Sequence, residues 1–354
     1  MKFVVVGQFG TEDFGLHISE NLEKMGHSVV AKVSVVPVSN GGKTKIGRLQ
    51  KLRKVALDNM RNAKKNVRDL ANKRILREVC AQNADVVLCT KDYFLGYEIQ
   101  TIRNKTGAKV CMWFPDSLST TGRASFLLSG YDAVFFKDKY MVYEFREIHA
   151  VNAFYLPECY SPIRHVCYQL SEDDKNRYRC EIAVAGNLHA QRVAMLRQLN
   201  QYDLKIYGTK GPWWVDMSGL ENCYTGQYIA YQEKAKLFQS ASVCLNTTHF
   251  SEIDGQNCRT FETLGAGGLL LTRYTDGVEE LFEDGVEALT YRTMDELKGK
   301  VDFCIKNPEK AKQIAERGQK RAEKCHTYEI RLNRMIRLLG KSSYTTKDVY
   351  DYTQ

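Results

Sequence analysis

The stretch NCRTFETLGAGGLLLT (residues 257–272) predicts a short helix, a glycine-rich turn and an apolar strand, in that order. Asn257 is a favourable N-cap residue because its side chain can accept a hydrogen bond from the first turn of the helix. Gly265, Gly267 and Gly268 end the helix and allow a tight turn into the strand. This segment therefore predicts one helix-to-strand unit of an α/β sheet.

The same alternation of helical patterns and apolar runs extends over most of the chain. Continuous apolar strands separated by helices indicate parallel sheets covered on both faces. The first series of predicted strands lies at residues 2–7, 28–36, 84–90, 108–114, 131–137 and 153–157. The second lies at residues 180–187, 204–209, 242–248, 268–275 and 287–291. We predict two Rossmann-like, doubly wound α/β domains that face a cleft, with a C-terminal helix packing across them.

The length and the local composition of the chain indicate where these domains begin and end. A chain of 354 residues fits two domains. The polar, irregular pattern of residues 161–179 predicts a linker, so we expect domains at residues 1–165 and 166–340 and a polar, frayed tail at 341–354. No apolar run approaches the ~18 residues of a transmembrane helix, and the N-terminal run is too short for a signal peptide.

The 11 cysteines are scattered without a CxxC pair. This pattern favours reduced, buried thiols in a cytoplasmic protein over a disulfide framework or a metal site.

The predicted helix at the start of residues 257–272 carries a charged pair. Arg259 and Glu262 are three residues apart and share a helical face. A helix N-terminus with an arginine suits a diphosphate, and a carboxylate one turn later can accept hydrogen bonds from the vicinal hydroxyls of a ribose. The alternative is a surface salt bridge beside an ordinary helix end.

This segment resembles a known family. Asn-x-Arg-x-Phe-Glu followed by x-x-Gly-x-Gly-Gly and an apolar strand is similar to the C-terminal domain of CgeB-like (spore-maturation-type) glycosyltransferases of the GT-B group. The resemblance covers about residues 180–340 and extends to His326-Thr-Tyr328 with Arg331. It implies that Glu262 holds the donor ribose and Arg259 the diphosphate. The donor-binding residues that it implies are Arg259, Glu262, Asn187, Arg192, Tyr207, Gly208, Tyr224, Tyr228, Asn257, Asp254 and Gly265.

The resemblance assigns the acceptor to the first domain. Glycines in the loop at residues 7–17, among them Gly10, allow the backbone to approach a ligand. The candidates for acid/base catalysis are Glu12, Asp13, His17 and Asp116, and for each the alternative is a helix cap or a solvated loop. No DxD sequence follows a strand, which favours a metal-independent reaction with the leaving-group charge stabilised by Arg259 and the helix dipole.

A basic segment in the first domain holds more than the whole net charge of +9. Between Lys43 and Arg77 there are 13 lysines and arginines against two acids. Apolar residues recur there at threes and fours, which predicts one long amphipathic helix at about residues 46–79. Lys51, Lys54 and Lys64 are candidate acceptor contacts. The helix predicts an anionic partner such as nucleic acid, a membrane surface or a phosphate-rich acceptor, and the alternative is a solvated face.

The sequence thus predicts a cytoplasmic GT-B-type glycosyltransferase, a hexosyltransferase, that needs no cofactor beyond its donor. It would move a sugar from a UDP- or other NDP-sugar to an acceptor hydroxyl, with DNA, a lipid-linked glycan or a phosphate-rich glycan as the possible acceptor. Three alternatives remain open: a nucleotide-sugar epimerase, a nucleotide-binding protein without catalysis, and a DNA-binding protein.

Overall fold

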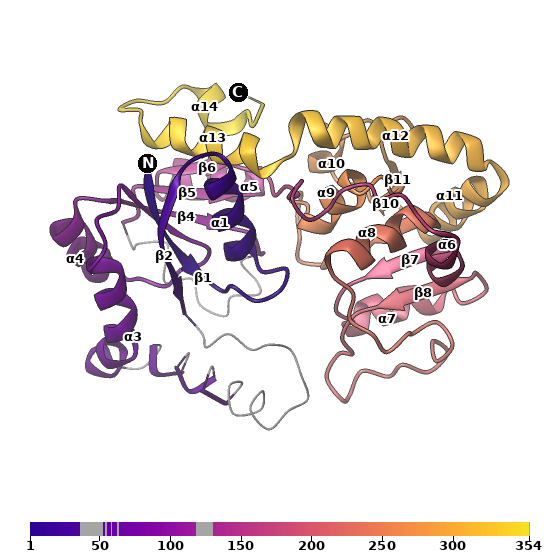
Figure 1. The fold of residues 1–354 in the computed structure, drawn as a ribbon, viewed down its shortest axis with the longest axis horizontal. Helices are drawn as coiled ribbons and strands as arrows, with labels where there is room; N and C mark the ends of the chain where they lie inside the picture. The colour runs from indigo at the N-terminus through magenta and orange to yellow at the C-terminus, as the bar shows by residue number, and fades with distance from the viewer. Residues whose placement is uncertain (36–51, 54, 58, 62–63, 118–129, 354) are drawn as a thin grey trace. The chain divides into compact units, whose positions relative to one another are not determined.

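The computed structural model describes residues 1–35, 52–53, 55–57, 59–61, 64–117 and 130–353 (Figure 1). The chain divides into two compact units. Unit 1 consists of Met1–Leu156 and Arg331–Gln354, and unit 2 of Pro157–Ile330. This division differs from the predicted boundary at 165/166, and it assigns the last residues to the first unit instead of to a separate tail.

Unit 1 contains a six-stranded parallel sheet in the order β2-β1-β3-β4-β5-β6. Its strands are β1 (Lys2–Gly7), β2 (Ser28–Ser34), β3 (Val86–Cys89), β4 (Lys109–Phe114), β5 (Ala133–Phe136) and β6 (Ala153–Tyr155). Its helices are α1 (Phe14–Lys24), α3 (Lys65–Cys80), α4 (Gly96–Thr106), α5 (Lys139–Tyr143), the π-helix η3 (Glu144–Ile148) and α14 (Thr346–Tyr350). Helix α13 (Tyr328–Leu339) begins in unit 2 and continues into unit 1.

Unit 2 contains a five-stranded parallel sheet in the order β11-β10-β9-β7-β8. Its strands are β7 (Cys180–Ala185), β8 (Leu204–Tyr207), β9 (Ala241–Asn246), β10 (Leu270–Arg273) and β11 (Leu289–Tyr291). Its helices are α6 (Glu172–Tyr178), α7 (Ala190–Arg197), α8 (Tyr231–Ser240), α9 (Cys258–Gly265), α10 (Asp276–Leu281), α11 (Met294–Lys306) and α12 (Pro308–Cys325). Each of the eleven predicted strands is present, so the prediction of two doubly wound sheets is confirmed.

Strand β7 shows why these strands read as continuous apolar runs. Ile182 and Val184 point into a core shared with α7, α11 and α12, whereas Ala183 and Ala185 point into a core shared with α8. Successive side chains of a strand face opposite sides, so a strand covered by helices on both sides needs an apolar residue at every position. The two alanines, which are the smaller side chains, face the α8 side of the sheet.

The predicted linker at residues 161–179 contains a helix that the sequence prediction missed. Helix α6 begins at a capping box in which Ser171 Oγ accepts the Asp174 backbone N–H (3.1 Å) and the Asp174 carboxylate accepts the Ser171 backbone N–H (3.1 Å). Ser-x-x-Asp was the available signal, because two backbone donors are satisfied reciprocally by this spacing.

The predicted basic helix at about 46–79 is not continuous. Lys64 has extended backbone angles (φ −62°, ψ 154°) and acts as the N-cap residue of α3, so this helix starts at Lys65. Lys51 and Lys54 lie outside the described residues. No helix in the described part of the chain offers an uncharged apolar stretch long enough to span a bilayer.

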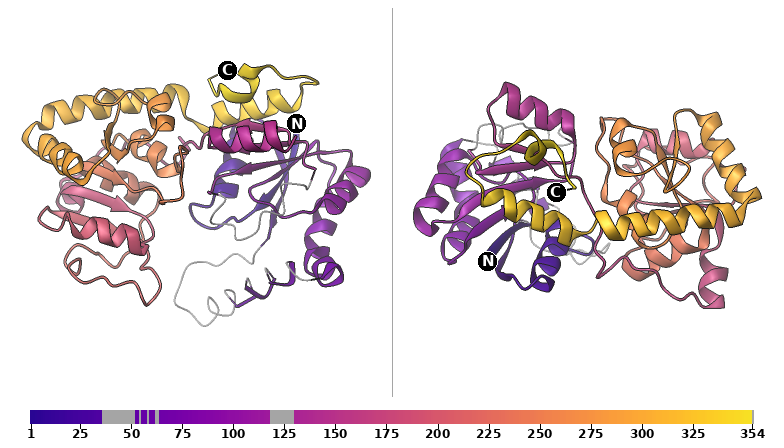
Figure 2. Two further views of the ribbon diagram at one scale, coloured as in Figure 1. Left: turned by 180° about the vertical axis from the view of Figure 1, so that it is seen from behind. Right: turned by 90° about the horizontal axis from the view of Figure 1, so that it is seen from above.

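The last residues are ordered against unit 1, which corrects the prediction of a frayed tail. The Phe154 and Tyr344 rings meet edge to face at 4.7 Å, and the Tyr155 and Tyr352 rings at 5.9 Å. Thr345 is the N-cap residue of α14, and the Asp348 carboxylate completes the capping box by accepting the Thr345 backbone N–H. Asp348 also pairs with Lys341 Nζ at 2.6 Å. Figure 2 shows α14 and the C-terminal segment lying against this unit. Buried aromatic contacts anchor residues whose sequence is mostly polar.

Candidate functional site

The N-terminus of α9 in unit 2 is fixed by the end of strand β9. Asn257 Oδ1 accepts the backbone N–H of Arg259 at 3.1 Å, which confirms the predicted N-cap. Asn246, the last residue of β9, donates through Nδ2 to Asn257 Oδ1 (3.2 Å) and to Thr260 Oγ1 (2.8 Å). The carboxyl end of a parallel strand thus holds a helix N-terminus, which is the usual location of an anion site in this kind of sheet.

Two guanidinium groups converge on the backbone of Gly186, just after β7. Arg259 Nη1 donates to the Ala185 carbonyl oxygen at 3.1 Å. A Cβ atom at Gly186 would lie 1.9 Å from Arg259 Nη1 and 3.2 Å from Arg192 Nη1. Gly186 also has φ +143°, a conformation that other residues rarely adopt. The close approach of the two arginines therefore requires glycine at this position.

These two cations lack an acidic partner within the described residues. Arg192 donates to the carbonyl oxygens of Asn187 and Thr247, the latter at 2.6 Å, and Arg259 Nε is buried without a hydrogen-bond partner. Burial, and then the neighbouring Arg259 guanidinium, lower the pKa of Arg192 to about 9. Arg192 with this pKa is still charged at neutral pH, and its repulsion by the Arg259 guanidinium is one that a bound anion would relieve.

Two histidines lie beside the guanidinium pair. The rings of His189 and His249 are nearly perpendicular, with centroids 5.9 Å apart. Partial burial, followed by the charges of Arg192, His249 and Arg259, lowers the pKa of His189. An anion bound here would favour protonation of His189, whose imidazole could then donate to an oxyanion. Neither histidine was singled out from the sequence.

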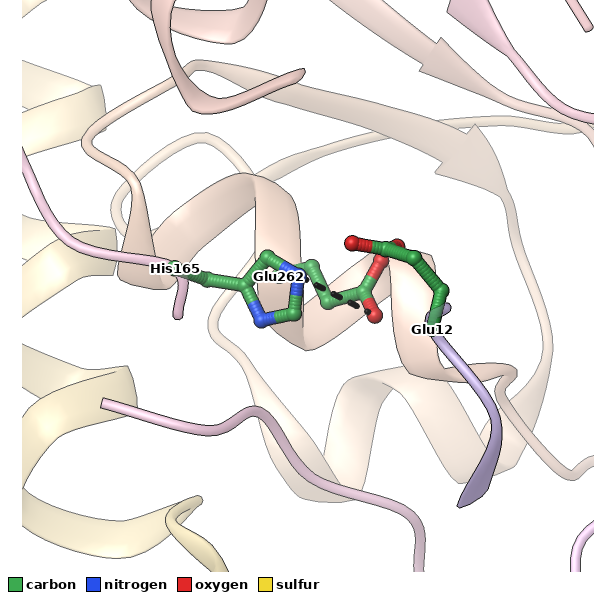
Figure 3. Close-up of side chains that lie close together, drawn as sticks. All are labelled: Glu12, His165 and Glu262. Carbon is green, nitrogen blue, oxygen red and sulfur yellow. Dashed lines mark ion pairs between the residues drawn. The ribbon is translucent and has the colours of Figure 1, made fainter. Parts of the chain in front are cut away.

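Glu262 does not pair with Arg259. It is 3% exposed, and its Oε2 accepts from Lys234 Nζ of α8 at 2.9 Å. Its other oxygen, Oε1, lies 3.6 Å from Nε2 of His165, which is itself 1% exposed. Figure 3 marks this ion pair with a dashed line. The alternative of a surface salt bridge with Arg259 is wrong, because the two side chains of this helix reach different neighbours. Burial lowers the pKa of His165, and the Glu262 charge opposes that shift.

The loop after β8, the predicted base-binding region, packs directly on the loop after β7. A Cβ at Gly208 would lie 2.1 Å from the Gly186 carbonyl oxygen, and Gly208 has φ +143°. Tyr224 Oη donates to the Gly208 carbonyl oxygen at 3.0 Å. The Tyr207 side chain belongs to the core on the α8 side, whereas Tyr228 is 59% exposed. Only the backbone of Tyr207 can therefore line a site at this edge.

The remaining predicted donor residues have local contacts within unit 2. The exposed Asn187 accepts from Thr209 Oγ1 at 2.5 Å through its side-chain oxygen. The Asp254 backbone carbonyl accepts from Thr275 Oγ1 at 3.2 Å. At Gly265 a Cβ would lie 2.3 Å from the Tyr160 ring, so this glycine is explained by packing.

The predicted catalytic residues belong to unit 1. Asp13 Oδ2 accepts the backbone N–H of Gly10 at 2.6 Å, which closes the turn before α1. Glu12 occupies the same turn with φ 67°. His17 is 3% exposed on α1. Asp13 is therefore engaged by the turn, and His17 lies within the packed layer.

Asp116 is a partly exposed candidate at the end of a strand of unit 1. It lies just beyond β4, forms an ion pair with Lys91, and both side chains are 42% exposed. The helix that it was alternatively expected to cap would fall outside the described residues. Of the predicted acceptor contacts, Lys64 is exposed at the start of α3.

Lys234 is the functional candidate that sequence reasoning missed. It lies on the buried face of α8 beside Ala235, Leu237 and Phe238, and it is 5% exposed. A lysine between apolar positions of a helix is a detectable signal, since buried lysines require a partner. The partner, 28 residues away on α9, could not be named without the fold.

Comparison with protein families gives one match. Residues 191–337 match the family model described as "Glycosyl transferase-like". No curated protein sequence matches the chain.

Solved structures resemble the chain over nearly its whole length. HepE of Anabaena in complex with UDP-glucose has a TM-score of 0.63 at 12% identity, covering 96% of this chain and 99% of that one. A glycosyltransferase from Rickettsia africae has a TM-score of 0.65 at 14% identity (97% and 100% covered). Sucrose-phosphate synthase from Thermosynechococcus elongatus has a TM-score of 0.64 at 11% identity (96% and 98% covered). The chain therefore has the two-domain GT-B fold, and its residues 191–337 are similar in sequence to glycosyl transferase-like proteins.

Proposed function

We propose that this chain is a glycosyltransferase that transfers a hexose from a nucleoside diphosphate sugar, and that UDP is the nucleotide. One observation carries the proposal: Arg192 and Arg259 converge on Gly186 beside the N-terminus of α9 without an acidic partner among the described residues. Two cations and a helix N-terminus are the elements that bind a diphosphate and stabilise its charge as it leaves the sugar.

The matches support this choice of ligand. HepE of Anabaena, whose fold resembles this chain, binds UDP-glucose. The sequence similarity to glycosyl transferase-like proteins covers α9 and the helix that carries Arg192. We further propose that the protein is of the CgeB-like kind, that it acts in the cytoplasm, and that it needs no metal.

Glu262 is proposed to hold the donor ribose. Lys234 fixes the carboxylate from α8, and a carboxylate can accept two hydrogen bonds from vicinal hydroxyls. Its test is separate from that of the arginines, since a change at Glu262 also removes the ion pair with Lys234.

Asp116 is the proposed base for the acceptor hydroxyl, because it is the open carboxylate beyond a strand end of unit 1. Asp116→Asn should lower kcat by about 10²–10⁴-fold while UDP affinity stays unchanged. Equal loss of kcat and of UDP affinity would contradict this role. The acceptor is proposed to bind unit 1.

The experiment that tests the diphosphate site is calorimetric titration of UDP and of uridine into wild type and Arg259→Gln. A lost charged hydrogen bond should weaken UDP binding by about 1.5–3 kcal/mol, or about ten- to hundredfold. Uridine lacks the diphosphate, so its affinity should be the same for both proteins.

Arg317→Ala is the matched control. It removes an exposed arginine of the same unit that donates to the Val286 carbonyl oxygen at 2.8 Å. UDP binding that is unchanged in folded Arg259→Gln would reject the proposed site. UDP binding without sugar transfer from any UDP-hexose would favour the non-catalytic alternative.

A further inference from the structure

Helices α3 and α4 of unit 1 are labelled in Figure 1. Their side chains line an open groove of about 790 Å³. Its lining includes the apolar side chains of Leu70, Leu76 and Ala81. Lys73, Arg77 and Lys105 also line it. An apolar floor and three cations therefore share one surface, which the diphosphate site of unit 2 does not use.

The cations of this groove are not neutralised by neighbours. No ion pair among the described residues involves Lys73, Arg77 or Lys105. The acidic lining residue, Asp69, pairs with Lys65 Nζ at 2.7 Å and accepts from Tyr97 Oη at 2.6 Å. Contact with these two groups lowers the pKa of Asp69, which keeps its charge engaged locally. The groove thus presents a positive surface that calls for an anionic occupant.

Large apolar side chains of this basic region are exposed to solvent. Leu70 in the groove is 66% exposed, and Leu52 and Val55 of the preceding helical residues are 68% and 57% exposed. Exposed leucine and valine among lysines and arginines are typical of helices that lie in a membrane interface, where the apolar groups enter the acyl boundary and the cations meet anionic headgroups.

We propose that the α3–α4 surface docks the protein on a membrane that contains anionic phospholipid, with Leu70 entering the lipid and Lys73, Arg77 and Lys105 contacting phosphate groups. The apolar component decides between lipid and nucleic acid, because contact with a DNA backbone needs cations but no exposed leucine. The inference stands independently of the donor site, which lies in the other unit.

The experiment is co-sedimentation of the full chain with vesicles of phosphatidylcholine alone, or of phosphatidylcholine and phosphatidylglycerol in equal parts. Binding should require the anionic lipid. The triple variant Lys73→Ala/Arg77→Ala/Lys105→Ala should bind roughly a hundredfold more weakly, from about a fivefold loss for each cation. Leu70→Ser should bind about tenfold more weakly, from the lost apolar burial.

A matched control removes three exposed lysines of another helix. Lys310→Ala/Lys312→Ala/Lys320→Ala in α12 changes the net charge equally and should bind the vesicles as wild type does. Circular dichroism and thermal unfolding show whether unit 1, which carries the groove, is folded in each variant.

Three results would overturn the proposal. The first is that wild type does not bind the anionic vesicles. The second is that the groove variant and the control variant lose equal vesicle affinity. The third is that Leu70→Ser binds the vesicles as wild type does. Binding of duplex DNA, with a steep salt dependence and no binding of vesicles, would assign the surface to nucleic acid instead.

Discussion

Glu262→Leu tests whether the buried ion pair between α8 and α9 supports unit 2. The side chains of Lys234 and Glu262 are 6% and 4% exposed, and Nζ and Oε2 are 2.9 Å apart. Replacing the carboxylate leaves the Lys234 ammonium buried beside an apolar group. Removal of one partner of a buried pair costs about 3–5 kcal/mol.

The expected change is large enough to measure by calorimetry. For a unit of this size, 1 kcal/mol corresponds to about 2–4 °C, so Glu262→Leu should lower the Tm of the unit 2 transition by about 6–20 °C. Adding Lys234→Met to Glu262→Leu removes the buried ammonium group as well. The double variant should recover most of the lost Tm, since replacing a buried ion pair by apolar groups is often neutral or stabilising.

A surface pair provides the control. Lys175 and Glu172 are paired at 2.6 Å with side chains 53% and 81% exposed. Glu172→Ala should therefore cost only about 0–1 kcal/mol. The reasoning is refuted if Glu262→Leu lowers the Tm by less than about 2 °C, or if the double variant is no more stable than the single one.

Three further outcomes are expected. Gly186→Ala should weaken UDP binding, measured by titration, because its Cβ would lie 1.9 Å from the guanidinium of Arg259. Gly299→Ala, whose Cβ would meet no atom within 4 Å, should instead stabilise α11 by about 0.5–1 kcal/mol in urea unfolding. Equal changes of the two variants in UDP affinity and in unfolding free energy would contradict this. Glu98→Ala should destabilise unit 1 by about 3–5 kcal/mol in urea unfolding, because Arg68, paired with Glu98 at 2.8 Å, would be left buried and unpaired; a loss below about 1 kcal/mol would show that the pair contributes little. UDP binding should take up protons and strengthen from neutral to mildly acid pH, since burial and then the neighbouring Arg192 lower the pKa of His189 and a bound diphosphate would raise it again. Calorimetry in two buffers of different protonation enthalpy measures this proton uptake, which should disappear in His189→Asn.

The sheets could be predicted because their signal is local. Strand β7 is apolar at nearly every position since both of its faces are covered, and the sequence shows this directly. The start of α9 could also be predicted, because Asn257 caps the helix through a hydrogen bond within that helix. The family resemblance added the expectation of a GT-B fold, which the solved structures confirm.

The contacts of the candidate site could not be predicted in the same way. Arg259 and Glu262 share a helix, but their partners come from the end of β7 and from α8. Those partners are fixed by how the sheet orders its strands, β9 beside β7, and not by sequence spacing. The same holds for Gly265, which sequence reasoning assigned to the donor and which the structure explains by the Tyr160 ring.

The return of residues 331–354 to unit 1 bears on how the protein is made. Residues 1–156 emerge from the ribosome first, but this unit cannot complete its packing until residues 331–354 emerge, because Tyr344 and Tyr352 pack on β6. Unit 2 is contiguous and can fold first as a whole. At about 5–20 residues per second, the nascent first sheet waits for many seconds with its β6 side uncovered. During that interval a chaperone could bind the uncovered apolar side of β6.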